Sequence, residues 1–303
     1  MNQNQFNDDI LLTVITPTYN RAHTLSKCYE SLCKQLCKDF VWMIIDDGST
    51  DDTEKIASGW IEKNDIPIIY KKKENGGKAS ALNIGIDLLK TKYAVCLDSD
   101  DSFYEDAVSA ALQELQQIDN DKKCCGILAL RNNPDGSVMG RVEIPQDMET
   151  ITAADVFLKL NLNTELICFY KTDFLCKYRF PEFSGEKFVS PAWMQYRITQ
   201  DYYFKPVYGK YISCEYLEDG LTRNKKKVIL KNPRGYTSVK RFSFNLSPFF
   251  IQRIKHGIMY DYGCILSKEK KWLSNVNHKM LALLLMPMAF VVYIRRKNIK
   301  NEK

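Results

Sequence analysis

Three short apolar segments of this 303-residue chain each stop abruptly at a polar loop, and no other feature limits the possible folds more. The segments are residues 11–16, 40–45 and 93–97, and helix-length stretches separate them. Alternating strands and helices with short connections predict a parallel sheet with right-handed crossovers. Such sheets bind their ligands at the carboxyl ends of the strands, so we expect the site in the loops that follow these segments.

The third segment ends in Asp98-Ser99-Asp100-Asp101, a loop with three carboxylates within four residues. Carboxylates so close together are costly to bury unless a cation neutralises them. Mg²⁺ or Mn²⁺ shared with substrate phosphates would do so, since these hard cations take oxygen ligands and few of them from protein. Taken alone, the loop is equally compatible with a solvated acidic turn that caps the next helix.

Further strands and helices follow from apolar periodicity and breaker residues. The first strand is expected to stop at Pro17, and Pro67 indicates an edge position for a strand at 66–70. The remaining predicted strands are 124–130 and 165–170, and the predicted helices are 24–37, 50–63, 78–91, 104–119 and 152–160.

The formal net charge of +6 conceals a division of the chain. Residues 1–222 contain 24 Lys and Arg against 34 Asp and Glu, a net of −10, whereas residues 223–303 contain 19 against 3, a net of +16. Such a basic region favours an anionic partner, either a membrane or nucleic acid. No nucleic-acid-binding motif is present, so no nucleic-acid partner is expected. Ten cysteines without a Cys-x-x-Cys pair, and only three histidines, argue against zinc.

Four motifs in this order resemble those of family 2 glycosyltransferases with the GT-A fold. They are Pro17-Thr18-Tyr19-Asn20, Asp46-Asp47-Gly48-Ser49-Thr50-Asp51, Asn75-Gly76-Gly77-Lys78 with Ala81-Leu82-Asn83-Ile84-Gly85, and Asp98-Ser99-Asp100-Asp101. The resemblance covers residues 10–120. It implies an α/β fold with a Rossmann-like, mostly parallel sheet flanked by helices, here followed by a basic and apolar helical appendage.

The resemblance also implies roles for residues of the first three motifs. Pro17 and Tyr19 would hold the nucleotide of an activated sugar, with the flat Tyr19 ring against uracil. Asp46 and Asp47 would accept hydrogen bonds from the base and ribose, and Lys78 would reach the base or the diphosphate. Without the resemblance, each of these residues is equally compatible with a structural role in a loop or turn.

In the acidic loop, the resemblance implies that Asp98 lies on the ribose side of the nucleotide. It also implies that Asp100 binds a Mn²⁺ or Mg²⁺ cofactor, which in turn binds the diphosphate. A second metal ligand is expected at Asp219, because its spacing from Tyr216 matches a Tyr-x-x-His arrangement of the family. A turn before a linker is the alternative for that segment. Asp101 has no implied role.

Gly185-Glu186-Lys187-Phe188 resembles a segment of bacterial capsule and surface-polysaccharide transferases. Glu186 is the implied catalytic base, although Lys187 stands where the family pattern has an Asp. An inverting transfer needs such a base, because the acceptor hydroxyl loses its proton as it attacks the anomeric carbon. The alternative is an exposed loop acid paired with Lys187.

We expect a GT-A domain over residues 1–224, with a nucleotide-sugar half at 10–130 and an acceptor half at 131–224. The basic, aromatic-rich region 225–303 follows, and its apolar run 280–294 is shorter than the ~20 residues that span a bilayer. We expect residues 280–297 to lie in a membrane interface, with a buried core helix as the alternative. The polar, acidic residues 1–9 lack signal-peptide features, which predicts a cytosolic enzyme domain.

The predicted function is inverting, metal-dependent transfer from a nucleotide sugar, expected to be UDP-linked, to a glycan or lipid-linked acceptor. The expected setting is bacterial surface-polysaccharide synthesis at the cytoplasmic face of the inner membrane. Two alternatives stay open: transfer to a polyprenyl phosphate carrier, and a non-catalytic, nucleotide-binding membrane scaffold. A nucleotidyltransferase is disfavoured, because Pro17-Thr18-Tyr19-Asn20 is not the Gly-rich loop that such an enzyme needs.

Overall fold

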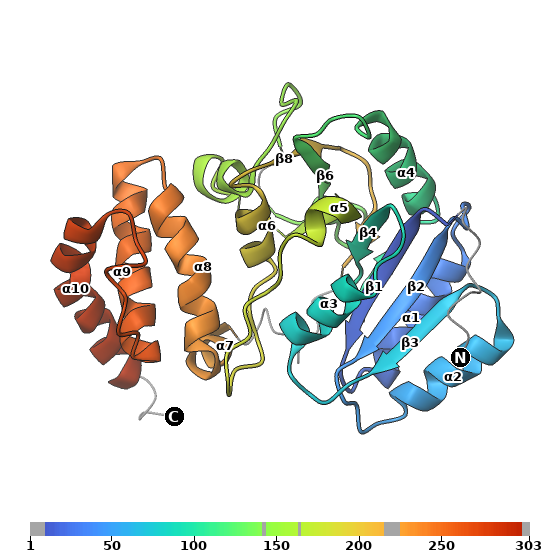
Figure 1. The fold of residues 1–303 in the computed structure, drawn as a ribbon, viewed down its shortest axis with the longest axis horizontal. Helices are drawn as coiled ribbons and strands as arrows, with labels where there is room; N and C mark the ends of the chain where they lie inside the picture. The colour runs from blue at the N-terminus through green and yellow to red at the C-terminus, as the bar shows by residue number, and fades with distance from the viewer. Residues whose placement is uncertain (1–9, 141–143, 163–164, 215–224, 299–303) are drawn as a thin grey trace.

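A computed structural model describes residues 10–140, 144–162, 165–214 and 225–298 (Figure 1). A seven-stranded sheet in the order β3-β2-β1-β4-β7-β6-β8 forms its centre. Its strands are β1 (Leu12–Thr18), β2 (Phe40–Asp46), β3 (Ile68–Lys72), β4 (Tyr93–Cys96), β6 (Cys124–Leu130), β7 (Leu166–Lys171) and β8 (Tyr203–Pro206). A small second sheet pairs β5 (Ser102–Phe103) with β9 (Ile212–Ser213).

The sheet has a hydrophobic core on each face, because successive strand residues point to opposite sides. Val14 belongs to one core and the adjacent Ile15 to the other. The first core lies against helices α1 (Ala22–Cys33), α2 (Thr53–Lys63) and α4 (Ala107–Gln117). The second lies against α3 (Lys78–Asp87), α5 (Thr172–Leu175), α6 (Ala192–Ile198) and the π-helix η1 (Asp155–Lys159). Helices on both faces make this the α/β architecture expected from the sequence.

One detail of the sheet differs from the sequence prediction, and a second adds to it. β1 continues through Pro17, which pairs with Ile45 of β2; its other neighbour, β4, is paired only as far as Ile15, so Pro17 has a strand on one side only. β7 runs antiparallel to both β4 and β6, so the sheet is mostly parallel, as the family resemblance implied. A continuous apolar run shows burial on both faces but carries no signal of strand direction.

Other boundaries shift by a few residues. β3 lies at the edge of the sheet, as Pro67 predicted, but begins one residue after that proline. The predicted helix 152–160 is a π-helix of five residues, with Asp155 accepting hydrogen bonds from the backbone and hydroxyl of Thr152.

In the described residues 225–298, four helices follow the sheet: α7 (Lys225–Lys231), α8 (Pro233–Leu246), α9 (Phe250–Ser267) and α10 (Lys279–Asn298). Figure 1 shows α8, α9 and α10 side by side as a layer beyond α6. Within the described residues, no helix combines the length and the apolar character needed to cross a membrane.

One buried acid stands out in this helical layer. Asp261 of α9 is fully removed from solvent, and neither of its carboxylate oxygens has a hydrogen-bond partner among the described residues. Burial raises the pKa of Asp261 to about 7.

Candidate functional site

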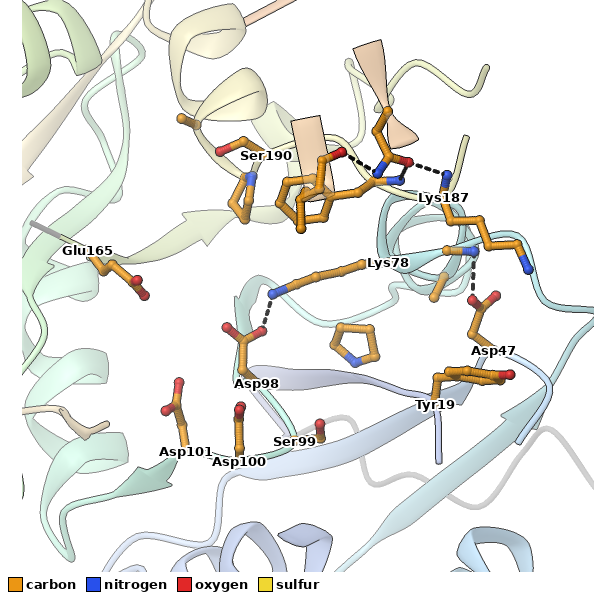
Figure 2. A pocket seen from close by; sticks show the side chains of 18 of the residues that line it. Tyr19, Asp47, Lys78, Asp98, Ser99, Asp100, Asp101, Glu165, Lys187 and Ser190 are labelled. Carbon is orange, nitrogen blue, oxygen red and sulfur yellow. Dashed lines mark hydrogen bonds and ion pairs between the residues drawn. The ribbon is translucent and has the colours of Figure 1, made fainter. Parts of the chain in front are cut away.

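A cavity of about 910 Å³ opens at the carboxyl ends of β1, β2 and β4 (Figure 2). Pro17 and Tyr19 line it from the loop after β1, Asp47 from the loop after β2, and Asp98 and Asp100 from the loop after β4. Because these strands are parallel, their loops meet at one edge of the sheet. The structure therefore brings together the three polar loops that the sequence pointed to.

Asp47 holds the second and third motifs together. Its carboxylate accepts hydrogen bonds from the backbone N–H of Gly76 at 2.9 Å and of Gly77 at 2.6 Å, and from Nζ of Lys73 at 2.8 Å. Gly77 has φ +94°, and a Cβ there would lie 1.9 Å from the carbonyl oxygen of Lys187, so only glycine fits. These contacts hold the beginning of α3, and its first residue, Lys78, lines the cavity.

Asp46 does not reach the cavity, which corrects the sequence prediction. Its side chain is fully buried, accepting hydrogen bonds from the Tyr70 hydroxyl at 2.5 Å and the Ser49 backbone N–H at 2.7 Å. Asp46 is the last residue of β2, so its side chain and that of Asp47 point in different directions. Asp46 shapes the loop rather than the cavity surface.

Tyr19 projects into the cavity with 47% of its surface exposed. The next residue, Asn20, adopts φ 51° and joins two loops: its side-chain oxygen accepts a hydrogen bond from the Thr50 N–H at 2.8 Å, and its own N–H donates to the Ser49 hydroxyl at 2.9 Å. An exposed ring on a fixed loop suits stacking on a nucleobase. That role stays a prediction.

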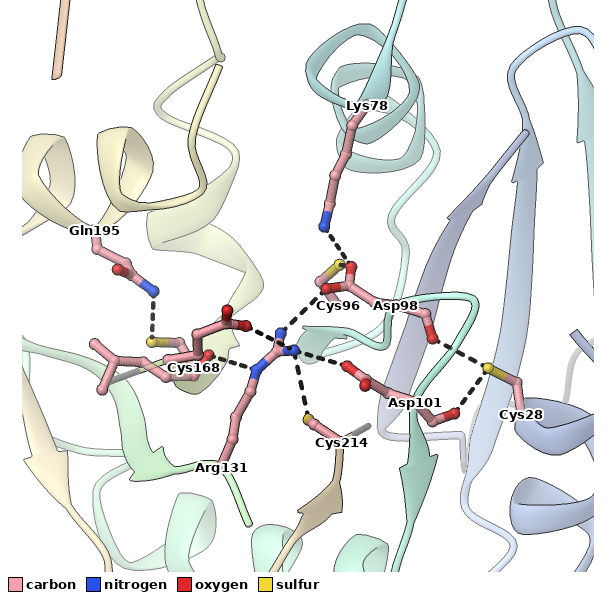
Figure 3. A network of polar contacts seen from close by, with 11 residues as sticks. Cys28, Lys78, Cys96, Asp98, Asp101, Arg131, Cys168, Gln195 and Cys214 are labelled. Carbon is pink, nitrogen blue, oxygen red and sulfur yellow. Dashed lines mark hydrogen bonds and ion pairs between the residues drawn. The ribbon is translucent and has the colours of Figure 1, made fainter. Parts of the chain in front are cut away.

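Carboxylates of the acidic loop form ion pairs with two cations, Lys78 and Arg131. Nζ of Lys78 lies 2.5 Å from Oδ1 of Asp98, and the Arg131 guanidinium lies 3.3 Å from Oδ2 of Asp98 and 2.7 Å from Asp101 (Figures 2 and 3). Burial disfavours the charged form of Asp98, but these two cations outweigh it and hold the pKa of Asp98 below its usual range. Asp98 is therefore an anion held between two cations.

The pKa values of Asp100 and Asp101 shift in the opposite direction to that of Asp98. Burial raises the pKa of Asp100, and the neighbouring Asp98 charge adds to the effect. Burial also raises the pKa of Asp101 to about 7, although Arg131 opposes this. A divalent cation bound at this loop would offset the repulsion among the carboxylates. This repulsion is the reason why the sequence predicted a bound cation.

Sequence reasoning missed Arg131. It directly follows β6, which runs parallel to β4 because both strands are antiparallel to the intervening β7. Its guanidinium also lies 3.6 Å from a carboxylate oxygen of Glu165 and 3.6 Å from the Cys214 sulfur. The available signal was a charged residue at the end of a buried strand, the same signal that drew attention to Asp98.

The candidate metal ligands among the described residues are carboxylates of one loop. Within the described ranges, no three His, Cys, Asp or Glu side chains cluster closely enough to hold an ion by themselves. Asp100 lines the cavity beside Asp98, and a carboxylate oxygen suits Mg²⁺ or Mn²⁺ when substrate phosphates supply further ligands. The donor chemistry thus fits such an ion at Asp100. Asp219, the other predicted ligand, lies outside the described residues.

Glu186 is engaged elsewhere, contrary to the role implied by its motif. Its carboxylate accepts hydrogen bonds from the backbone N–H groups of Arg234 at 2.9 Å and Gly235 at 2.8 Å, at the beginning of α8. It is not among the residues that line the cavity, whereas Lys187 and Ser190 are. A carboxylate at a helix N-terminus satisfies N–H groups that lack partners within the helix.

Glu165 is a second residue that sequence reasoning missed. It immediately precedes β7 and lines the cavity on the side away from Tyr19 (Figure 2). Its side chain is 38% exposed, compared with 19% for Asp98 and 5% for Asp101. Among these three carboxylates, Glu165 is the most accessible to a molecule entering the cavity.

Comparisons with known proteins place the chain in a family. Residues 13–176 match the family described as glycosyl transferase family 2, which is more than half of the chain. The chain belongs to glycosyltransferase family 2. This confirms the resemblance carried by the four motifs, and the match extends beyond them through β7 and α5.

Relatives and solved structures agree with this family. The chain is 42% identical over 109 residues to an uncharacterized glycosyltransferase of Rickettsia felis, and 35% identical over 130 residues to chondroitin synthase of Pasteurella multocida. These alignments cover 36% and 43% of this chain but only 18% and 13% of the relatives. This chain thus matches only a small part of those relatives' length.

The fold is similar to that of TarS 1–349 from S. aureus in complex with UDP-GlcNAc, with a TM-score of 0.56 and 17% identity over 96% of this chain and 92% of that one. A mannosyltransferase from Pyrobaculum calidifontis, solved with GDP-Man and Mn²⁺, gives a TM-score of 0.50 and 18% identity over 94% of this chain and 75% of that one. Both likenesses confirm the GT-A fold predicted from the sequence.

Proposed function

We propose that this chain transfers a sugar from a UDP-sugar to an acceptor, with inversion at the anomeric carbon. The observation that carries the proposal is the Lys78–Asp98–Arg131 cluster beside Asp100, at the carboxyl ends of the parallel strands. A cavity of about 910 Å³ suits a ligand of nucleotide-sugar size. A structural neighbour solved with UDP-GlcNAc supports UDP as the nucleotide.

The donor diphosphate would lie between Lys78 and Asp100. Asp100 would hold Mn²⁺ or Mg²⁺, which supplies positive charge to the diphosphate as the sugar leaves. Lys78 lines the same cavity, so its ammonium would add a second charge beside the leaving group. Asp98 keeps that ammonium in place at 2.5 Å and would accept a hydrogen bond from the ribose.

For the base, we propose Glu165 in place of Glu186. Glu165 lines the cavity opposite the nucleotide loops, whereas the Glu186 carboxylate is bound to two amides of α8. The Glu165 carboxylate would take the proton of the acceptor hydroxyl while that oxygen bonds to the anomeric carbon. The bond from the anomeric carbon to the diphosphate then breaks, and the diphosphate keeps the electron pair.

The proposed setting is synthesis of a bacterial surface glycan on a glycan or lipid-linked acceptor, at the cytoplasmic membrane face. The Gly185-Glu186-Lys187-Phe188 segment supports it, as does the similarity to a chondroitin synthase. A polyprenyl phosphate acceptor is the second candidate, because Lys187, Lys225 and Lys227 line the same cavity and would attract a phosphate.

A panel of nucleotide sugars tests the proposal. The purified chain is incubated with UDP-GlcNAc, UDP-glucose, UDP-galactose and GDP-mannose, with Mn²⁺ or with EDTA, and the released nucleoside diphosphate is measured. We expect Mn²⁺-dependent hydrolysis of at least one UDP-sugar. Preferred hydrolysis of GDP-mannose would contradict the UDP assignment. UDP binding in calorimetry without hydrolysis or transfer would instead favour the non-catalytic scaffold.

A further inference from the structure

Helix α10 has two different sides. Ala282, Leu285 and Ala289 are buried and follow one another at helical spacing, so they form one side. This side packs on α9 so closely that a Cβ on Gly257 would lie 2.6 Å from Leu285. The inner side of α10 is therefore fully occupied by the rest of the helical layer.

The opposite side is apolar and exposed. Seven of its side chains are between 43% and 71% exposed, and we call them the α10 stripe: Met280, Leu283, Leu284, Met288, Phe290, Val291 and Ile294. At 100° per residue they fall within less than half of the helix circumference, centred opposite Ala289. A continuous apolar surface of this kind marks an interaction site.

Positive charge lies at both ends of the α10 stripe. Lys279 precedes it, and Arg295, Arg296 and Lys297 follow it. Between Glu269 and Glu302 the sequence contains seven Lys and Arg and no Asp or Glu. A second copy of the chain would bring an equally basic surface against this one, whereas an anionic lipid bilayer offers both an apolar interior and negative headgroups.

We propose that the α10 stripe lies in the interface of an anionic lipid bilayer, parallel to its surface. Arg296 lies over the Tyr262 ring at 4.9 Å, which orients the basic end of the helix. Figure 1 shows this end of α10 at the same end of the helical layer as α7, whose lysines line the cavity. A membrane contacted by the α10 stripe would lie along the outer side of the helical layer, with α9 and α8 between it and the sheet.

Vesicle sedimentation tests the proposal without any sugar donor, so failure here is separate from failure of the proposed transfer. The probes are vesicles of phosphatidylcholine alone and of an equal mixture with phosphatidylglycerol. We expect binding to the anionic vesicles that weakens as ionic strength rises. Leu284→Asp should weaken it by about tenfold or more, because it places a charge in the centre of the stripe.

Matched variants separate the stripe from general surface effects. Leu36→Asp changes an equally exposed leucine outside α10 and should bind vesicles like the wild type. Lys297→Glu with Arg295→Glu should weaken binding, whereas Lys55→Glu with Lys90→Glu, two exposed lysines of the sheet domain, should weaken it less. Circular dichroism melting shows whether each variant is folded.

Equal binding of Leu284→Asp and the wild type would overturn the proposal. Absence of binding to anionic vesicles at low salt would do the same. Light scattering in the absence of vesicles tests the competing occupant: a dimer that Leu284→Asp dissociates, together with no vesicle binding, would assign the stripe to a second copy of the chain.

Discussion

Nη1 of Arg131 lies 2.7 Å from Oδ2 of Asp101, and both side chains are almost entirely removed from solvent. The same guanidinium contacts Asp98, so one cation just after β6 contacts two carboxylates of the loop after β4. Arg131 is thus a positioning residue for the acidic loop. It acts through its contacts with two acids of that loop.

Removing this cation should destabilise the fold. Arg131→Met leaves Asp101 buried without its partner, and the free energy of unfolding in urea should fall by about 3–5 kcal/mol. Arg179→Met is the control, because its ion pair with Asp87 is about half exposed and should contribute less than about 1 kcal/mol. Adding Asp101→Asn to Arg131→Met should restore part of the loss. A loss below about 1 kcal/mol for Arg131→Met would contradict this role.

Asp100→Asn should remove the metal dependence of the site. In the wild type, calorimetry should show tighter UDP binding with Mn²⁺ than without it; in the variant the two affinities should be equal. Donor hydrolysis should fall by about a hundredfold or more, since the charge on the leaving diphosphate loses its metal. Asp106→Asn is the control, because this exposed residue before α4 makes no capping hydrogen bond with its side chain. Mn²⁺-enhanced UDP binding that persists in Asp100→Asn would refute the metal assignment.

Glu165→Gln and Glu186→Gln form a matched pair for the base. Glu165→Gln should lower kcat of donor hydrolysis by about 10²–10⁴ while leaving KM for the donor nearly unchanged. Glu186→Gln should keep kcat within a few-fold, because its oxygens face the amides of Arg234 and Gly235. The reverse result would return the role to Glu186. If neither substitution affects transfer to a polyprenyl phosphate, which needs no deprotonation, that acceptor is favoured.

Asp261 predicts an unusual pH dependence of stability. Its pKa is about 7 in the folded chain, above the ordinary value of 3.8, so the folded state binds more protons between these limits. The contribution of Asp261 to stability therefore becomes less favourable as pH rises through this window. Asp261→Asn should unfold like the wild type near pH 4 and be more stable by about 3–4 kcal/mol at pH 8, since each pKa unit corresponds to about 1.4 kcal/mol. A stability difference that stays constant over this range would contradict the prediction.

Sequence reasoning located the strands that end in polar loops, because each end combines a buried apolar run with a sudden change to charge. It placed β6 correctly at 124–130 but did not foresee that β7 runs antiparallel. Strand direction depends on the path of the connecting segment, which leaves no periodic trace in the sequence.

The proposed donor side of the site was easier to predict than the proposed acceptor side for a similar reason. Tyr19, Asp47, Lys78 and Asp98 all line one cavity because their loops follow parallel strands. Asp46 did not join them, since adjacent residues at a strand end point in different directions. The Glu186 carboxylate is bound to the backbone of α8, far along the chain, and sequence patterns do not show such a contact. Glu165 immediately precedes β7, and no motif marked it.

The junction of α7 and α8 has a consequence for how such chains can be recombined. Asn232 accepts hydrogen bonds from the backbone N–H groups of Lys187 and Phe188, and it lines the cavity together with lysines of α7. The region after residue 224 therefore supplies part of the wall of the site. A chimera that joins the sheet domain to another protein's C-terminal helices would have to keep this junction. The proposed donor site and the proposed membrane contact therefore could not be exchanged independently in this chain.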